Sequence, residues 1–328
     1  MIGCVKKRII KSIMSVNCRQ LWWGFVLFLV VLMYGCYGVL IDLCKVDGEI
    51  PFLTASSVLL TEILKLFICL LVLLAQYKVH LLPLLTWKVV LPFSLPALCY
   101  AVNNNLAVFM QTQMDPATYM ILGNLKIVTT AILYKIIINK KFSDIQWLAI
   151  CLLTIGGIIN SIAALKVKTL ALSEIHTTFL GLAILLCYCF ISGFAGVYTE
   201  YILKKNLELS VFYQNVLLYT FGVMFNLICW LVQAYQKYVS TNQNYFDIFH
   251  GYSLYTWTVI ITQAMTGILF SLIMKYNSNI VRLFIIAAAP FVTTALSYYL
   301  FDLHIHSEFV ISAFFILIAA LIYNYNPT

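Results

Sequence analysis

One lysine, Lys126, lies near the middle of Pro116–Ile138, an apolar run that is long enough to cross a lipid bilayer. An ammonium group at that depth costs at least about 2.5–3.5 kcal/mol, so it needs a carboxylate partner or an anion that binds and leaves. Lys65 poses the same problem in Ser57–Leu74, and Lys275 lies at the end of a further apolar run. Several cations inside one bundle predict a path for an anion.

The residues around Lys126 repeat with the spacing of a helix. Tyr119, Gly123, Lys126 and Thr130 follow one another by four, three and four positions, which places them on one helix face. An aromatic ring at one level and cations at another suit an amphipathic anion with a planar end. Stacking would hold the planar base, while Lys126 and Lys65 would bind phosphates as point charges.

Polar residues in the earlier spans extend the candidate site. Glu62 precedes Lys65 by three residues on the same helix face, so an internal ion pair that only supports packing stays open. Asn104 follows Tyr100 by four residues and shares its face. The run Asn103–Asn105 could serve interhelical hydrogen bonds, which contribute about 0.6 kcal/mol each. Three amides in a row point around most of the helix, so we expect at least one to line a polar cavity.

The second half of the chain supplies further candidates. Ser192–Gly196 is a patch of small residues of the kind that lets helices approach closely. Its first two members, Ser192 and Gly193, are counted among the candidate substrate-binding residues. Asn215 and Tyr219 lie four residues apart and share a helix face. We expect that face to border the same cavity.

Composition predicts an all-α membrane protein. Hydrophobic residues make up 63% of the chain, charged residues 10%, and the mean hydropathy is +0.96, which excludes an ordinary soluble domain. The connections are short, so no large domain is expected outside the bilayer. About ten spans are predicted: Trp22–Asp42, Phe52–Tyr77, Trp87–Gln111, Pro116–Ile138, Ser143–Ala164, Thr177–Leu203, Val211–Ala234, Tyr252–Tyr276, Asn279–Phe301 and Glu308–Tyr325.

The distribution of basic residues predicts the orientation. With a cytosolic N-terminus, twelve lysines and arginines fall in cytosolic segments and four on the opposite face, so both termini are expected in the cytosol. Residues 1–20 form a basic arm beside anionic lipid, and no nucleic-acid partner is needed to explain them. The first span lacks a small-residue cleavage site and is interpreted as a retained helix.

No metal or other cofactor is predicted. The ten cysteines show no metal-ligand spacing and are interpreted as small buried hydrophobic residues. His304 and His306 lack a nearby carboxylate framework in the sequence, so a metal site there is not favoured.

An internal repeat falls at half the chain length. Val128–Tyr134 recurs as Val292–Tyr298, an offset of 164 residues in a chain of 328. The two matches lie in the fourth and ninth predicted spans. Five helices per half would give one repeat over residues 21–164 and an inverted one over 165–328. Inverted repeats around a midplane site are typical of alternating-access carriers, and an intramembrane enzyme has no particular need for them.

Several motifs also resemble those of a known family. Five of them resemble the nucleotide-sugar transporters of the Golgi, solute carrier family thirty-five, subfamily A: Thr61–Leu66, Tyr100–Asn105, Asn124–Ile127, Ser192–Tyr198 and Met274–Tyr276. Three more resemble most closely a UDP-sugar branch of that subfamily: Cys44–Gly48, Met114–Tyr119 and Tyr219–Gly222. The resemblance implies ten helices in two inverted repeats. It also implies a Golgi location and exchange of a cytosolic nucleotide sugar for a lumenal nucleoside monophosphate.

The resemblance also implies roles for individual residues. Lys65, Lys126 and Lys275 would lie at the phosphate and sugar end. The pyrimidine nucleoside would be surrounded by Tyr100, Asn104, Tyr119, Asn215 and Tyr219. Two positions differ from the CMP-sialic acid branch, because Asn103 replaces a glutamine and Gly123 replaces a tyrosine. The changed cavity shape argues against sialic acid, and a UDP-sugar or a CDP-linked polyol such as CDP-ribitol fits at least as well.

Two other functions stay open at this stage. One is a transport-inactive homologue that acts as a membrane scaffold or partner, although retention of the three lysines argues against it. The other is an intramembrane transferase, which is weaker because no loop offers paired carboxylates or a metal motif. The expected partners are the nucleotide sugar, the nucleoside monophosphate and the lipid bilayer. An oligomer of this chain with itself or with other Golgi transporters stays open.

Overall fold

The computed structural model describes residues 2–46, 49–76, 86–113, 116–167, 179–241, 246–301 and 307–325. These residues form helices and no strand beyond one isolated bridge between Val46 and Glu49. The helices are α1 (Ile2–Leu43), α2 (Thr54–Gln76), α3 (Trp87–Val90), the 3₁₀ helix η2 (Leu91–Phe93), α4 (Ser94–Gln113), α5 (Pro116–Leu122), α6 (Leu125–Ile137), α7 (Asp144–Val167), α8 (Phe179–Lys205), α9 (Val211–Thr241), α10 (Leu254–Tyr276), α11 (Asn279–Phe301) and α12 (Ser307–Tyr325). His304 and His306 lie outside the described residues.

Membrane-spanning helices dominate the described part of the chain, which confirms the predicted all-α membrane class. Nine spans there are long and apolar enough to cross a bilayer. The remaining predicted span, Trp87–Gln111, corresponds to α3, η2 and α4. Pro92 lies at the start of η2, and the run Asn103–Asn105 lowers the hydropathy of α4. The count of ten stays a prediction.

The fourth predicted span is not one continuous helix, which corrects the expectation for Pro116–Ile138. It is divided into α5 and α6 by a turn at Gly123 and Asn124. The Asn124 amide donates to the Ile121 carbonyl at 3.3 Å, a tighter connection than an α-helix makes. A Cβ added at Gly123 would lie 2.7 Å from the Tyr119 carbonyl oxygen. The turn therefore needs a residue without a side chain.

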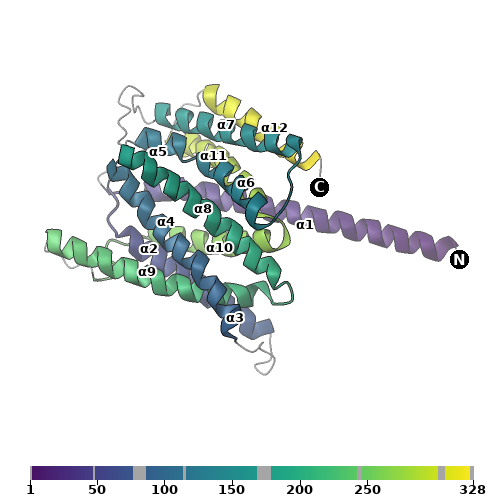
Figure 1. Cartoon of the computed structure of the whole chain (residues 1–328), viewed down its shortest axis with the longest axis horizontal. Helices are drawn as coiled ribbons and strands as arrows, with labels where there is room; N and C mark the ends of the chain where they lie inside the picture. The colour runs from purple at the N-terminus through teal and green to yellow at the C-terminus, as the bar shows by residue number, and fades with distance from the viewer. Residues whose placement is uncertain are drawn as a thin grey trace.

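The helices pack with a pattern of matched partners (Figure 1). α1 packs on α11, and α8 packs on α6. Likewise α4 packs on α8 as α10 packs on α1, and α4 packs on α9 as α10 packs on α2. α7 pairs with α12, and α2 pairs with α9. The contacts match when α1, α2, α4, α6 and α7 are taken as the counterparts of α8, α9, α10, α11 and α12. Two repeats related by a two-fold axis would give this pattern.

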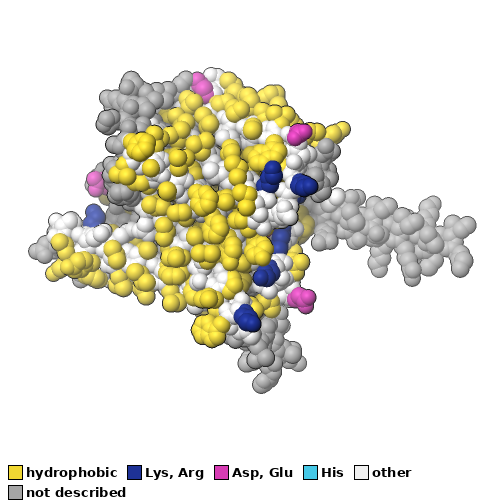
Figure 2. Space-filling view, in the orientation of Figure 1, with side chains coloured by type: hydrophobic (Ala, Val, Ile, Leu, Met, Phe, Trp, Pro, Cys, Tyr) yellow, Lys and Arg dark blue, Asp and Glu magenta, His cyan; other side chains and the backbone are white. Residues whose placement is uncertain are grey.

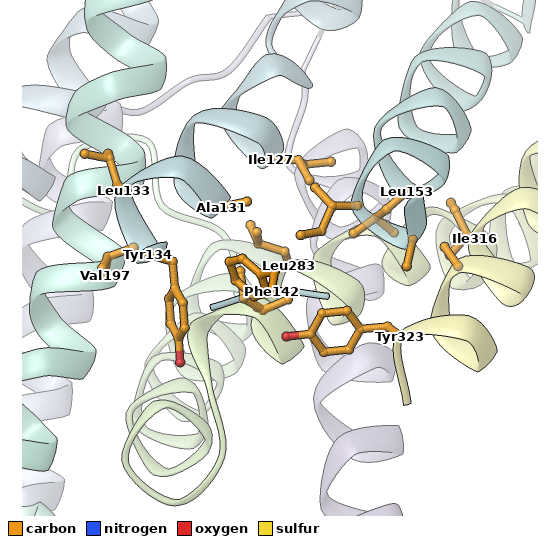
Figure 3. Packing of buried hydrophobic residues seen from close by; sticks show 14 residues of the cluster. Ile127, Ala131, Leu133, Tyr134, Phe142, Leu153, Val197, Leu283, Ile316 and Tyr323 are labelled. Carbon is orange, nitrogen blue, oxygen red and sulfur yellow. The ribbon is translucent and has the colours of Figure 1, made fainter. Parts of the chain in front are cut away.

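The largest buried apolar cluster joins α6, α7, α8, α11 and α12 (Figure 3). Tyr134 of α6, Leu153 of α7, Leu283 of α11 and Tyr323 of α12 belong to it. The outer surface of the bundle is also largely apolar (Figure 2), as a lipid-facing surface requires. Lys and Arg side chains gather toward the edge from which the first turns of α1 leave the bundle (Figures 1 and 2).

Candidate functional site

Two polar cavities meet at α1, inside the helix bundle. The first, which we call the Lys126 cavity, has a volume of about 340 Å³ and is lined by α1, α5, α6, α7, α8 and α11. The second, the Lys65 cavity, has a volume of about 400 Å³ and is lined by α1, α2, α4 and α8 to α11. Tyr34 and Tyr37 line both cavities. Each volume lies in the range of small-molecule sites.

Lys126 lies in the first turn of α6 and lines its cavity without a carboxylate partner. Among the described residues, no Asp or Glu oxygen lies within ion-pair distance of its Nζ. Tyr119 and Tyr188 line the same cavity, with ring centroids 6.1 Å apart and hydroxyl oxygens 3.5 Å apart. The cavity therefore combines an unpaired cation with two aromatic rings.

The turn between α5 and α6 is fastened to α7. The Asn124 side-chain amide donates to the Met120 carbonyl at 2.9 Å and to the Ser161 hydroxyl at 3.0 Å. A Cβ added at Gly157 would lie 2.4 Å from Asn124 Oδ1, so the absence of a side chain there makes room for this amide. These contacts fix the start of α6 and with it the position of Lys126.

Lys65 differs from Lys126 because it has a carboxylate partner. Its Nζ lies 2.5 Å from Glu62 Oε1 and 4.4 Å from the centroid of the Tyr219 ring. Two glycines accommodate the pair: a Cβ at Gly222 would lie 2.8 Å from Glu62 Oε2, and one at Gly267 would lie 2.9 Å from Lys65 Cδ. The internal ion pair left open by the sequence is thus present.

Tyr100 and Asn104 line the Lys65 cavity from α4, as does Tyr219 from α9. The neighbouring amides do not. Asn105 donates to Cys229 Sγ at 3.1 Å and accepts from Gln233 at 3.2 Å, which ties α4 to α9. Asn103 lines neither cavity, and its Oδ1 is buried without a hydrogen-bond partner in the part of the chain that the structure describes. The run of three amides therefore divides into one cavity residue and two residues outside the cavities.

Lys275 and Asn215 lie away from both cavities. Lys275 is buried, and its Nζ donates to the Leu209 carbonyl and, at 2.8 Å, to Gln214 Oε1. It thereby ties the end of α10 to the connection between α8 and α9. Asn215 is fully buried on α9, and within the described part of the chain neither polar atom of its side chain has a hydrogen-bond partner.

The small-residue patch contributes packing contacts. Thr130 donates its hydroxyl proton to the Lys126 carbonyl at 2.5 Å, one turn earlier on α6. A Cβ added at Gly193 would lie 3.0 Å from Thr130 Oγ1, so α6 and α8 touch at this point. Ser192 is partly exposed, and none of Ser192, Gly193 and Thr130 lines a cavity. Of the predicted Lys126 face, Tyr119 and Gly123 reach the cavity with Lys126.

Arg282 of α11 is a cavity residue that the sequence reasoning missed. It lines the Lys65 cavity, and among the described residues no carboxylate lies within ion-pair distance of it. Its position inside the predicted span Asn279–Phe301 was a signal that could have found it. The signal was weak because a long side chain one turn from the end of a span can reach the membrane surface.

A buried carboxylate connects three parts of the bundle. Glu200 of α8 is fully buried and accepts from the Tyr134 hydroxyl at 2.6 Å, from Lys204 Nζ at 2.5 Å and from the Asn279 backbone amide at 2.5 Å. Lys204 also donates to the Asn277 carbonyl at 2.6 Å. This network, which we call the Glu200 network, joins α6, α8 and the connection between α10 and α11.

Comparison with known proteins identifies relatives of the whole chain. A model of the family described as nucleotide-sugar transporter matches residues 21–324. Proteins named "Probable UDP-sugar transporter protein SLC35A4" are similar: the one from Xenopus tropicalis is 38% identical over 94% of this chain and 92% of its own length. The one from Danio rerio is 39% identical over 93% and 94%, and the human one is 36% identical over 93% and 94%.

A solved structure titled "Crystal structure of protein" shares the fold. It superimposes with a TM-score of 0.68 over 92% of this chain and 96% of that chain, at 11% sequence identity. At that identity the likeness concerns the arrangement of helices alone. The expected family resemblance of the sequence motifs is confirmed by the family match and the named relatives.

Proposed function

The chain belongs to the nucleotide-sugar transporter family, a family of transporters and not of enzymes, and from this premise we propose what it carries and how. It exchanges a cytosolic pyrimidine nucleotide sugar, a UDP-sugar or a CDP-linked polyol, for a lumenal nucleoside monophosphate across the Golgi membrane. The observation that carries the proposal is Lys126, an intramembrane cation in a polar cavity with no carboxylate partner among the described residues. Such a cation is expected to bind a mobile anion.

The charges of the two cavities fit these substrates. Lys65, Lys126 and Arg282 are three cations and Glu62 is one carboxylate, which leaves a net charge of +2. A nucleotide diphosphate sugar carries about two negative charges, and a nucleoside monophosphate carries about −1.5 to −2 near neutral pH. Either substrate neutralises the site, whereas an empty carrier returns with uncompensated cations in the membrane. Exchange is therefore favoured over uniport.

The two cavities divide the substrate between them. The Lys65 cavity offers the amide of Asn104 and the hydroxyls of Tyr100 and Tyr219, which suit the polar edge of a pyrimidine nucleoside. Tyr119, which the family resemblance would put beside the nucleoside, lines the Lys126 cavity together with Tyr188. These rings and the polar groups beside them suit a sugar or polyol instead. The phosphates would lie where the cavities meet.

The matched packing of the helices supports two inverted repeats, residues 21–164 and 165–328, which would rock about the cavities. The gathering of Lys and Arg side chains at one edge (Figure 2) supports cytosolic termini. In that orientation the Glu200 network lies at the cytosolic end. Tyr37 and Ser57, near the lumenal ends of α1 and α2, line the cavities. The structure would then represent the lumen-facing state.

The proposal is tested with purified protein in liposomes. Uptake of a labelled UDP-sugar, and separately of CDP-ribitol, is measured with and without UMP or CMP inside the vesicles. Preloading is expected to raise uptake severalfold, and an imposed membrane potential should have little effect. Accumulation driven by a potential or proton gradient and indifferent to preloading would contradict the exchange mechanism. Exchange of purine nucleotides alone would contradict the pyrimidine assignment.

A further inference from the structure

Arg282 lies beside the junction of the two cavities. It lines the Lys65 cavity together with Tyr34, which also lines the Lys126 cavity. Lys126 lines the neighbouring cavity, which shares Tyr34 and Tyr37 with the Lys65 cavity, so the two positive charges lie on either side of these tyrosines and within electrostatic range of each other. Two cations of like charge are therefore held near each other, Lys126 on α6 and Arg282 on α11. Like charges in a membrane interior repel strongly unless an anion lies between them.

The guanidinium has unused hydrogen-bonding capacity. Its contacts are made through Nη1, which donates to the Tyr100 hydroxyl and to Asn279 Oδ1, each at 3.4 Å. Nε is buried and has no hydrogen-bond partner among the described residues. The guanidinium carbon lies 5.0 Å from the centroid of the Phe270 ring, which supports its plane. A buried N–H group without a partner is costly, and a ligand oxygen would satisfy it.

The planar fork of an arginine matches the oxygens of a phosphate. Its parallel N–H groups bind two oxygens of one phosphate, whereas an ammonium group acts as a point charge. We propose that Arg282 binds one phosphate of a nucleoside diphosphate ester through Nε and a terminal nitrogen, while Lys126 binds the other phosphate. The Tyr100 and Asn279 contacts to Nη1 hold the fork in place.

This assignment rests on the proposed function and gives a structural reason for its substrate class. Donors with two linked phosphates, such as UDP-sugars and CDP-linked polyols, place one phosphate on each cation. A CMP-linked sugar has a single phosphate and cannot engage Lys126 and Arg282 in this way. The site is therefore a diphosphate site, and Arg282 is the residue that distinguishes diphosphate from monophosphate ligands.

The test compares UDP with UMP, and CDP with CMP, as competitors of labelled UMP or CMP exchange by the purified transporter. Wild-type protein is expected to bind each diphosphate more tightly than the matching monophosphate. The gain from a charge-assisted pair of hydrogen bonds is roughly 10- to 100-fold. Arg282→Lys keeps the charge and loses the fork. It should remove most of this preference while monophosphate exchange continues. Lys135→Gln removes an exposed cation on α6 and should leave the preference unchanged.

Each other outcome is decisive. Equal affinity of the wild-type protein for diphosphates and monophosphates overturns the inference. This measurement needs no variant, so the inference can be refuted even if the Arg282→Lys protein folds poorly. A preserved preference in Arg282→Lys, or an equal loss for both ligand classes, means that Arg282 only positions Tyr100 and Phe270. Failure of the wild-type protein to exchange any pyrimidine nucleotide overturns the proposed function instead.

Discussion

Glu62 Oε1 lies 2.5 Å from Lys65 Nζ inside the Lys65 cavity, whereas Arg282 of the same cavity and Lys126 of the neighbouring cavity have no such partner among the described residues. The two intramembrane lysines therefore differ in their surroundings. Lys65 is paired with a carboxylate of its own helix, whereas Lys126 has no carboxylate partner among the described residues and, by our proposal, binds the substrate anion. A substrate phosphate that reached Lys65 would have to compete with Glu62.

Replacing Glu62 by Gln should expose that difference. The variant keeps the shape of the side chain and leaves Lys65 without its carboxylate, so the ligand-free protein should lose about 3 kcal/mol, the low end for breaking a buried pair. UMP should then stabilise the variant more than the wild-type protein, because an added anion replaces the lost charge. Thermal unfolding in detergent with and without UMP measures both effects. Equal stability of the two ligand-free proteins would show that the pair contributes nothing.

Substitution of two adjacent asparagines, Asn104 and Asn105, should have different effects, one on transport and the other on stability. Asn104 lines the Lys65 cavity, so Asn104→Ala should reduce uptake at least severalfold with little change in unfolding temperature. Asn105 bonds α9, so Asn105→Ala should destabilise the protein by about 1 kcal/mol and spare the affinity for nucleotide. Uptake, nucleotide affinity and thermal unfolding are measured on both variants. Loss of stability in Asn104→Ala together with loss of nucleotide affinity in Asn105→Ala would contradict the placement of α4.

Gly267 should be needed for the position of Lys65. A Cβ at Gly267 would lie 2.9 Å from Lys65 Cδ, and the flexible side chain would have to move away from Glu62. We expect Gly267→Ala to change transport more than stability. Gly24→Ala is the matched control, because a Cβ there meets nothing within 4 Å. Uptake in proteoliposomes compares the two, and equal activity would argue against a role for the Lys65 position.

The Glu200 network should hold closed the end of the bundle that we propose faces the cytosol. Glu200→Gln removes the charge that accepts from Tyr134, Lys204 and the Asn279 amide. The amides between Asn277 and Asn279 should then exchange hydrogen faster, because this end opens more often. Hydrogen–deuterium exchange read by mass spectrometry measures this, with the exposed Glu208→Gln as control. Unchanged exchange in Glu200→Gln would mean that the network does not control opening.

Much of the fold could be predicted because membrane helices can be recognised in a sequence from the length and hydropathy of its apolar runs. Lys126 and Tyr119 could be placed in one cavity because both still line the same side of the segment, although the turn at Gly123 interrupts the helix between them. That turn itself depends on a close backbone contact, which no periodicity reveals. Lys275 looked like a cavity cation, but its partners are the Leu209 carbonyl, in the connection between α8 and α9, and the Gln214 side-chain amide, at the start of α9. Such partners depend on tertiary packing and cannot be predicted from spacing.

The inverted-repeat proposal could be derived from one short match, Val128–Tyr134 with Val292–Tyr298. The same offset also indicates that α6 and α11 are counterparts. It did not indicate that Arg282, near the start of α11, lines the Lys65 cavity, while Lys126, near the start of α6, lines the Lys126 cavity. At that offset the counterpart of Lys126 is Pro290 and the counterpart of Arg282 is Thr118, so the repeat gave no sign of Arg282.

Uptake by Lys126→Ala tests the central claim most directly. The variant and the control Lys135→Ala are purified, shown to be folded by thermal unfolding, and placed in liposomes preloaded with UMP. The account predicts that Lys126→Ala loses exchange of a labelled UDP-sugar while it remains folded, since removal of an unpaired intramembrane charge does not destabilise the empty protein. Lys135→Ala should exchange at the wild-type rate. Exchange by Lys126→Ala at the rate of Lys135→Ala would contradict the claim that Lys126 binds the transported anion.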